Sequence, residues 1–438
     1  MRSKSSILLP AFLLLASVQL AQARTASEVL VRKALSANTG ESASAIAELR
    51  SMGPAGLTLL SEKYANEIER QVTDPSVVAT SEWRRLSTAL DAISQQKDSY
   101  ISGLYWYTDF GQAKAAARAA GKPILSLRLL GKLSEEFSCA NSRFFRTVLY
   151  PNAEVSRMLR DRFILHWQSV RPAPRVTIDF GDGRKLEQTL TGNSIHYILD
   201  SNGVPIDALP GLYGPAAFRR SLDRIESVFK ELAKPGNRKL AHHRERLNAI
   251  NLEWVADIQN SGGKIPESII VVRGADGRPT AVEVASLAIT KMISEATMLR
   301  SMTAGARALG SISDEAIWRK MAMLHLADAK LDARSISLIK RKSQNAFMAD
   351  GSKTIPETAL ANLVNKLEMN IALDTVRNEY LLHPKLHAWL SVNSLTDNLD
   401  RLNEKVYAEL FLTPASDPWL GLFSAETYTA LENGGISR

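Results

Sequence analysis

Cys139 is the only cysteine of this 438-residue chain, and Ser142 follows it in the order Cys139-Ala140-Asn141-Ser142. A thiolate attacks a disulfide to form a mixed disulfide, and a second thiol must then resolve that bond. Because this chain has one thiol, the resolving thiol would have to come from another molecule. The residue types therefore predict, at most, a redox chemistry that uses a single cysteine.

The residues around Cys139 could make its thiol reactive. A helical pattern covers 142–150, so Cys139 is expected at or just before a helix N-terminus, where the helix dipole and free N–H groups favour a thiolate. Arg143 and Arg146 would add positive charge, and Ser142 could donate a hydrogen bond to the sulfur. The alternative is a buried, inert cysteine that packs as a small apolar side chain. Both interpretations stay open at this point.

Two histidines offer a second chemistry. His166 and His196 fall on predicted strands of the same sheet, and a cysteine–histidine pair is the nucleophilic unit of cysteine hydrolases. No local sequence signature of such a hydrolase surrounds Cys139. We therefore expect both histidines to be core residues with satisfied hydrogen bonds.

The other histidine motifs are not expected to bind a metal. His242 and His243 are adjacent on a predicted helix and would point about 100° apart. His383 and His387 have helical i,i+4 spacing, but Pro384 is expected to disrupt the helix, and no carboxylate follows at a useful offset. The sequence predicts no metal and no cofactor.

The elements that must position these residues alternate between strands and helices, which predicts a mixed sheet with helices on both faces. Two hairpins are marked by Gly181-Asp182-Gly183 and by Asp200-Ser201-Asn202-Gly203. The predicted strands are Ile101–Tyr107, Pro123–Leu129, Phe163–Trp167, Val176–Phe180, Lys185–Leu190, Ile195–Leu199 and Val204–Ala208, and the predicted helices are Phe110–Ala120, Ser142–Tyr150, Ala153–Asp161 and Pro215–Leu232.

From Trp106 to about Phe229 this order resembles the thioredoxin superfamily, with Cys-x-x-Ser in place of Cys-x-x-Cys. The resemblance implies an α/β thioredoxin-like fold in which Cys139 is the nucleophile and Ser142 replaces the resolving cysteine. It is carried by Gly121-Lys122-Pro123-Ile124, Cys139, Phe144-Phe145, Phe163, Ile198-Leu199-Asp200-Ser201-Asn202-Gly203 and Gly211.

The same resemblance assigns the loop before the penultimate strand. Ser194 occupies the place of the family's cis-proline, and Asn193 and Ser194 are implied to contact the substrate. A serine there is expected to be trans, because a cis non-proline bond costs about 3 kcal/mol. The stretch Leu130–Phe137 and the hairpin Arg175–Leu190 are additions to the minimal fold.

The N-terminus has the order of a secretory signal peptide. Arg2 and Lys4 precede the apolar run Ile7–Val18, which is too short to span a membrane stably, and Ala21-Gln22-Ala23 is a cleavage site. We therefore expect a periplasmic or secreted protein without a stable membrane anchor. The predicted parts are a signal peptide (1–23), a helical N-terminal region (24–98), a thioredoxin-like domain (99–234) and a mostly helical C-terminal domain (238–438).

The charge of the chain excludes one class of partner. The formal net charge is +8 and becomes +6 when Arg2 and Lys4 leave with the signal peptide. The basic residues are dispersed and do not alternate with aromatic residues, so we do not expect nucleic-acid binding. The expected partners are a protein or low-molecular-weight thiol, and a protein that docks on the helical regions.

Two functions follow from these patterns. The first is an exported thioredoxin-like protein with a monothiol redox role, in which Cys139 is the nucleophile or the acceptor of a mixed disulfide. The second is a non-catalytic interaction or scaffold protein on the same fold. Whether the chain is an enzyme, with a thiol–disulfide oxidoreductase-like activity, depends on whether the thiol is accessible.

Overall fold

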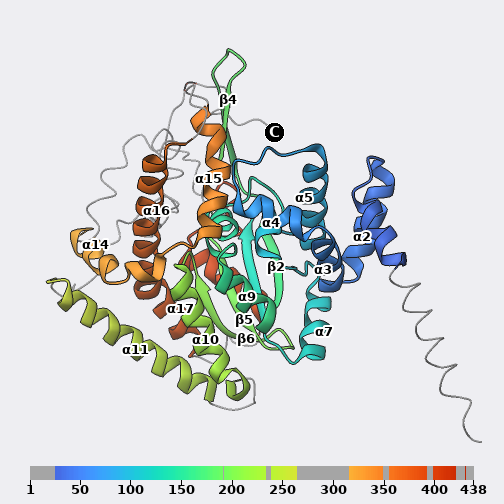
Figure 1. Cartoon of the computed structure of the whole chain (residues 1–438). Helices are drawn as coiled ribbons and strands as arrows, with labels where there is room; N and C mark the ends of the chain where they lie inside the picture. Colours follow the sequence, from blue (N-terminus) through green and yellow to red (C-terminus); the bar gives the residue numbers. More distant parts are fainter. Residues whose placement is uncertain are drawn as a thin grey trace, which may run out of the picture. The chain divides into compact units, whose positions relative to one another are not determined.

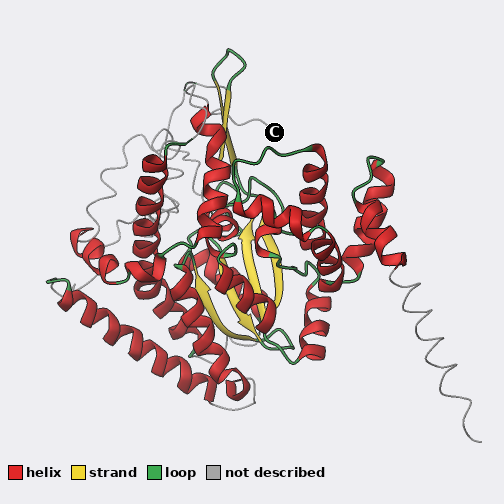
Figure 2. Ribbon diagram, in the orientation of Figure 1, coloured by secondary structure: helices red, strands yellow, loops and turns green. Residues whose placement is uncertain are grey.

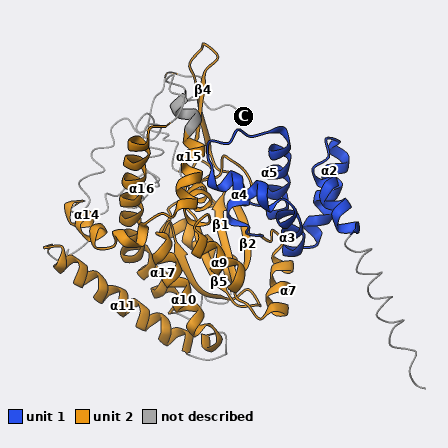
Figure 3. Ribbon diagram, viewed as in Figure 1, with its two compact units in different colours: residues 1–105 blue, residues 106–438 orange. Residues whose placement is uncertain are grey.

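A computed structural model of the chain describes residues 25–190, 192–232, 238–263, 315–348, 355–391, 398–420 and 430. The chain divides into two compact units, residues 1–105 and 106–438 (Figure 3). The sheet and the helices after it belong to the same unit. The predicted signal peptide, a possible strand at 268–272 and a periodic segment at 285–302 lie outside the described residues.

Unit 1 is helical. Leu49, Leu60, Leu86 and Ile93 are almost fully buried and form the centre of its core. Its elements are a helix at 25–34, α2 (Thr39–Ser51), α3 (Pro54–Lys63), α4 (Ala65–Thr73), α5 (Ser81–Ser94) and α6 (Ser99–Ser102).

Helices α2 and α3 come very close together at Gly56. A Cβ atom on Gly56 would lie 1.9 Å from the backbone oxygen of Leu49, a distance that no real side chain tolerates. The turn between the helices uses Gly53, whose φ of 69° lies in the left-handed region, and Pro54, which starts α3 where no N–H is needed. The glycine at position 56 therefore sets the spacing of this helix pair.

We predict that Gly56→Ala lowers the stability of unit 1 by about 1–3 kcal/mol, because the added methyl group pushes α3 away from α2. The measurement is hydrogen–deuterium exchange of peptides from α2 and α3 in the full chain. The matched control is Gly40→Ala, where the nearest atom to the new Cβ is 3.5 Å away. Equal exchange in the two variants would contradict the prediction.

Unit 2 is built on a four-stranded mixed sheet (Figures 1 and 2). The strand order is β2-β1-β5-β6: β1 and β2 are parallel, and β5 is antiparallel to both β1 and β6. Strands β3 and β4 form a separate antiparallel hairpin. The strands are β1 (Ile124–Leu130), β2 (Ile164–Arg171), β3 (Arg175–Asp179), β4 (Lys185–Thr189), β5 (Ile195–Leu199) and β6 (Pro205–Pro210).

The described helices surround this sheet and continue after it, and none of them is long and apolar enough to cross a membrane. They are α7 (Phe110–Ala120), α8 (Ala140–Phe144), the π-helix η1 (Phe145–Leu149), α9 (Ala153–Arg162), α10 (Pro215–Leu232), α11 (Arg238–Asn260), α14 (Glu315–Leu324), the 3-10 helix η2 (Leu326–Ala329), α15 (Ala333–Met348), α16 (Glu357–Arg377), the π-helix η3 (Asn378–Leu382), α17 (His383–Leu390), α18 (Leu399–Lys405) and the π-helix η4 (Val406–Leu410).

One face of the sheet carries Ser126, His166 and Tyr197, which are register partners on β1, β2 and β5. Helix α7 covers part of this face, since the Phe110 ring lies 5.0 Å from the His166 ring. Helix α18 covers another part, because the Tyr197 hydroxyl donates to Asn403. Thus helices from opposite ends of unit 2 pack on the same face.

The other face carries Leu127 and its partner His196. The His196 ring lies 4.6 Å from Phe145 of η1 and 5.1 Å from Phe218 of α10. These helices therefore cover the second face. The predicted mixed α/β fold, with helices on both faces of a mixed sheet, is therefore confirmed.

One predicted strand is wrong. Ser99–Ser102 form the short helix α6 instead of the start of the strand Ile101–Tyr107. The Asp91 carboxylate accepts a hydrogen bond from the Ser99 N–H at 2.9 Å, and Gly103 ends the turn with a φ of 60°. Only Tyr107 pairs, through an isolated parallel bridge to His166. The hydrogen bond from Ser99 to Asp91 and the turn at Gly103 therefore favour a helical turn over the extended strand that was predicted.

An ion network ties α10, α11 and η2 together. His325 follows α14, and its Nε2 lies 2.6 Å from Asp257 Oδ2 while its Nδ1 lies 3.4 Å from Asp328 Oδ2. Arg220 of α10 also donates to Asp328, at 2.6 Å. Hydrogen bonds to Asp257 and Asp328 raise the pKa of His325 to about 9. The charged imidazole is therefore the favoured form in the folded chain.

We predict that this network stabilises the fold below about pH 6.5 and that its contribution is lost as pH rises toward 9. The raised pKa means that the folded state holds the proton which the unfolded chain releases near pH 6.5. The loss is about 1–2 kcal/mol, discounted because the His325 side chain is 30 % exposed. Urea unfolding at several pH values should show this fall in the parent and a flatter profile in His325→Gln. Parallel profiles would contradict it.

Candidate functional site

The Cys139 thiol lies inside unit 2, at the end of the loop that follows β1. Its residue is the N-cap of α8, and its N–H donates to the Leu130 carbonyl at 3.1 Å. The exposed fraction of Cys139 is 0 %. Sequence reasoning placed the cysteine at a helix N-terminus, and the structure does the same. The sequence around Cys139 did not predict this burial, because the residues that pack near the thiol come from distant parts of the chain.

Ser194 is the polar side chain that meets the thiol. It immediately precedes β5, and its Oγ lies 3.1 Å from the Cys139 Sγ, within hydrogen-bonding distance for sulfur. Pairing of β5 with β1 brings the two loops together. Gly192 makes the approach possible, since a Cβ there would lie 3.3 Å from the Cys139 Cβ. No described peptide bond is cis, as expected for serine at position 194.

The other side chains predicted to stabilise the Cys139 thiolate form hydrogen bonds with groups other than the sulfur. The Ser142 hydroxyl donates to the Cys139 carbonyl at 2.8 Å and accepts from the Ser138 hydroxyl at 2.6 Å. Arg143 donates to Thr189 Oγ1 at 2.9 Å, and buried Arg146 donates to the Glu136 carbonyl at 3.1 Å. The structure thus brings Cys139 and Ser194 together and directs the Ser142 and Arg143 polar atoms to other partners.

A covering segment (residues 398–420) closes the site from the C-terminal end of the chain. Tyr407 of η4 donates from its hydroxyl to the Asn193 carbonyl at 2.9 Å, next to Ser194. Burial raises the pKa of Tyr407 well above its ordinary value, and the neighbouring Cys139 raises it further. The buried phenol therefore stays protonated and serves as the donor to this loop.

Further hydrogen bonds hold the covering segment on the sheet. Tyr197 of β5 donates to Asn403, and Arg128 of β1 reaches Asp400 at 3.4 Å. Arg171, at the end of β2, donates to the Thr413 carbonyl at 2.6 Å and to the Asp417 carbonyl at 2.9 Å. Three strands thus bind one segment, which makes it part of the closed structure around the thiol.

His166 and His196 do not bond to the thiol. The Nδ1 of His166 lies 2.8 Å from Ser126 Oγ, and the Nε2 of His196 lies 2.7 Å from the Tyr150 hydroxyl. Burial lowers the pKa of each imidazole to about 3. Both are neutral core residues here, and the contacts give no cysteine–histidine pair. The expectation that their hydrogen bonds are satisfied is wrong for one nitrogen of each ring, because His166 Nε2 and His196 Nδ1 are buried without a partner.

A second cluster lies elsewhere in unit 2, and sequence reasoning missed it. This His–Asp cluster consists of Asp207, His243, His383 and His387, from β6, α11 and α17, and each residue is at most 3 % exposed. Oxygen and nitrogen atoms of Asp207, His243 and His387 lie within 4.8 Å of one another, close enough to hold a metal ion.

The expectation that Pro384 disrupts the helix is wrong. Helix α17 begins at His383, so Pro384 occupies the first turn, where its missing N–H costs nothing. His383 and His387 consequently lie one turn apart on an intact helix. The i,i+4 histidine spacing was the available signal. The carboxylate Asp207 could not be found, because strand pairing brings it in from far earlier in the chain.

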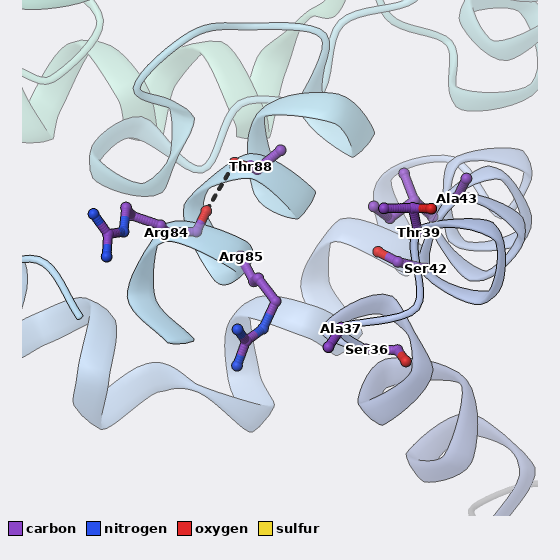
Figure 4. A pocket seen from close by; sticks show the side chains of 9 residues that line it. Ser36, Ala37, Thr39, Ser42, Ala43, Arg84, Arg85 and Thr88 are labelled. Carbon is purple, nitrogen blue, oxygen red and sulfur yellow. Dashed lines mark hydrogen bonds between the residues drawn. The ribbon is translucent and has the colours of Figure 1, made fainter. Parts of the chain in front are cut away.

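Unit 1 carries a hollow of about 490 Å³ (Figure 4). Arg85 is partly committed there, since its Nε donates to the Leu35 carbonyl at 2.9 Å. Most of the lining of the hollow is apolar, and the Arg84 side chain points away from the other labelled residues (Figure 4). Its lining residues are Ser36, Ala37, Thr39, Ser42, Ala43, Ile46, Arg84, Arg85 and Thr88.

Comparisons with protein-family models, with curated proteins and with solved structures find no match to this chain.

We predict that Tyr407→Ala increases the alkylation rate of Cys139 in the native protein by about tenfold or more. That factor corresponds to about 1.4 kcal/mol less free energy for local opening. Tyr407→Phe keeps the ring and loses only the hydrogen bond to Asn193, so its effect should be smaller. The measurement is the rate of iodoacetamide labelling at low urea concentrations. Rates equal to that of the parent in both variants would show that Tyr407 does not close the site.

Proposed function

We propose that this chain is an exported, non-catalytic interaction protein built on a thioredoxin-like scaffold, in which Cys139 is a core residue. The observation that carries the proposal is the closed thiol. Cys139 is fully buried, and Tyr407 of the covering segment bonds to the loop beside it. A thiol–disulfide exchange requires an accessible thiolate, so this arrangement favours a structural role for the sulfur.

The topology supports the thioredoxin-like part of the proposal. A parallel β1–β2 pair, an antiparallel β5–β6 pair and the order β2-β1-β5-β6 are those expected for that fold. Cys139 precedes the helix after β1, and Ser194 precedes β5 and faces the thiol. This is the relation that the sequence resemblance assigns to the nucleophile and to the position of the cis-proline.

The surroundings of the thiol support a non-catalytic role. A reactive thiolate gains from nearby positive charge, but Arg143 is directed to Thr189 and Arg146 to the loop at Glu136. The short α8 supplies only its N-terminus as a favourable feature. The closed site is therefore better suited to packing than to exchange.

One observation favours the second function, a monothiol redox role. The Cys139 sulfur lies 3.1 Å from the Ser194 hydroxyl, which could donate a hydrogen bond to a thiolate. Release of the covering segment would then expose a sulfur that already has a polar partner. The two functions differ in whether the native protein reacts at Cys139.

The helical unit offers the surface that an interaction protein needs. Its hollow between α2 and α5 is lined mainly by apolar atoms, with Arg85 among the lining residues, which suits an apolar side chain of a partner protein next to an acidic group. Export is proposed from the order of charged, apolar and small residues at the N-terminus.

The test of the proposed function is a challenge of the native full chain with oxidised glutathione, followed by intact-mass measurement. We predict no glutathionyl adduct on the native protein and a complete adduct after unfolding in urea, because only unfolding exposes the sulfur. A rapid adduct on the native chain would instead establish the monothiol redox function.

A matched control is Val78→Cys in a Cys139→Ala background. Val78 is 82 % exposed, so a thiol at this position should form the adduct in the native state. The Cys139→Ala parent should keep its fold and show no adduct under either condition. A native reaction at position 78 alone would show that the reagent is active and that Cys139 is protected by structure.

A further inference from the structure

We propose that the His–Asp cluster is a structural site for a divalent transition-metal ion, best suited to Zn²⁺, with Asp207, His243, His383 and His387 as its ligands. The proposal does not depend on the function of the thiol. The four residues come from β6, α11 and α17, and α17 contacts both of the other elements (Figure 1). A metal ion here would join the sheet to the helices that follow it.

Three donors are spaced as a metal site requires, and His243 lies beside them. His387 Nε2 lies 3.0 Å from His383 Nε2. His243 Nδ1 contacts the other nitrogen of the His387 ring, Nδ1, at 3.0 Å, and His243 offers a ligand atom within 4.8 Å of ligand atoms of Asp207 and His387. Asp207 Oδ1 lies 3.7 Å from His383 Nε2 and 3.9 Å from His387 Nε2. Zinc bonds of about 2.0–2.1 Å at tetrahedral angles separate neighbouring donors by about 3.4 Å. The three distances among Asp207 Oδ1, His383 Nε2 and His387 Nε2 lie on either side of that value.

The cluster contains a buried carboxylate and a buried nitrogen that a bound cation would suit. Asp207 Oδ1 accepts from the Ala208 N–H at 2.7 Å and lies 3.7 Å from His383 Nε2. The buried His243 Nε2 has no hydrogen-bond partner. A cation among these donors satisfies the buried carboxylate.

A second layer of residues already orients the ligands. Glu379 of η3 accepts from His383 Nδ1 and is itself held by Arg246 of α11 at 2.5 Å. A carboxylate on the far nitrogen fixes the tautomer that directs Nε2 toward a metal, as in many zinc sites. Four protein ligands and complete burial are the features of a closed, structural site.

The experiment measures Zn²⁺ in the exported full chain by mass spectrometry of the metal, and the spectrum of the chain loaded with Co²⁺. We expect about one equivalent of Zn²⁺ per chain, visible bands of tetrahedral cobalt, and a rise in Tm of at least ~5 °C on adding Zn²⁺ to protein stripped with a chelator. A folded parent chain that holds well under one equivalent and gives no cobalt bands would overturn the proposal.

Variants locate the ion. Asp207→Asn and His387→Gln should lose the metal, while His325→Gln and Cys139→Ala, which remove other candidate donors, should keep it. If a ligand variant does not fold, Glu379→Gln provides the test, because it leaves all four ligands in place and should weaken Zn²⁺ binding about 10–100-fold. Undiminished binding in Glu379→Gln together with any folded ligand variant would mean that the ion lies elsewhere and would refute the site.

Discussion

The pairing of β5 between β1 and β6 is the constraint on which both polar clusters of unit 2 depend. The β1–β5 register brings the loop ending at Ser194 against the loop ending at Cys139. The β5–β6 register, in which Ile198 pairs with Asp207, places that carboxylate in the neighbouring strand. A slip of one residue would turn every side chain of the strand to the opposite face. Both clusters would then be lost together.

Burial decides how the polar groups of these clusters behave. A buried polar atom is costly unless it has a partner, yet His166 Nε2, His196 Nδ1 and His243 Nε2 are buried without one. His166 and His196 stay neutral with hydroxyl partners, whereas Glu379 is charged: burial alone would raise its pKa, but His383 and Arg246 hold it at about 2. The environment, and not the residue type, separates a core histidine from a candidate metal ligand.

The three π-helices of the described chain adjoin the two clusters. Helix η1 continues the helix that begins after Cys139, η4 carries Tyr407 above the thiol loop, and η3 carries Glu379 immediately before α17. A π turn adds one residue to a helical turn and so re-aims the side chains that follow it. In η3 and α17 this places Glu379 beside the Nδ1 of His383, while the Nε2 of His383 faces Asp207 and His387.

The sequence by itself determined the local elements of this protein. Turn residues and apolar periodicity predicted most strands and helices around Cys139, because those signals act over a few residues. The failures were also local: Asp91 and Gly103 favoured a helical turn where an extended pattern was expected, and Pro384 began a helix instead of breaking one.

Tertiary structure alone decided what the chemistry-bearing residues can do. Tyr407 bonds to the loop beside Cys139, and Asp207 belongs to the His–Asp cluster; each lies far along the chain from its partners. No spacing rule connects such positions, since strand register and helix packing bring them together. A single sequence states which groups are available, and the folded chain determines which of them meet and which are closed to solvent.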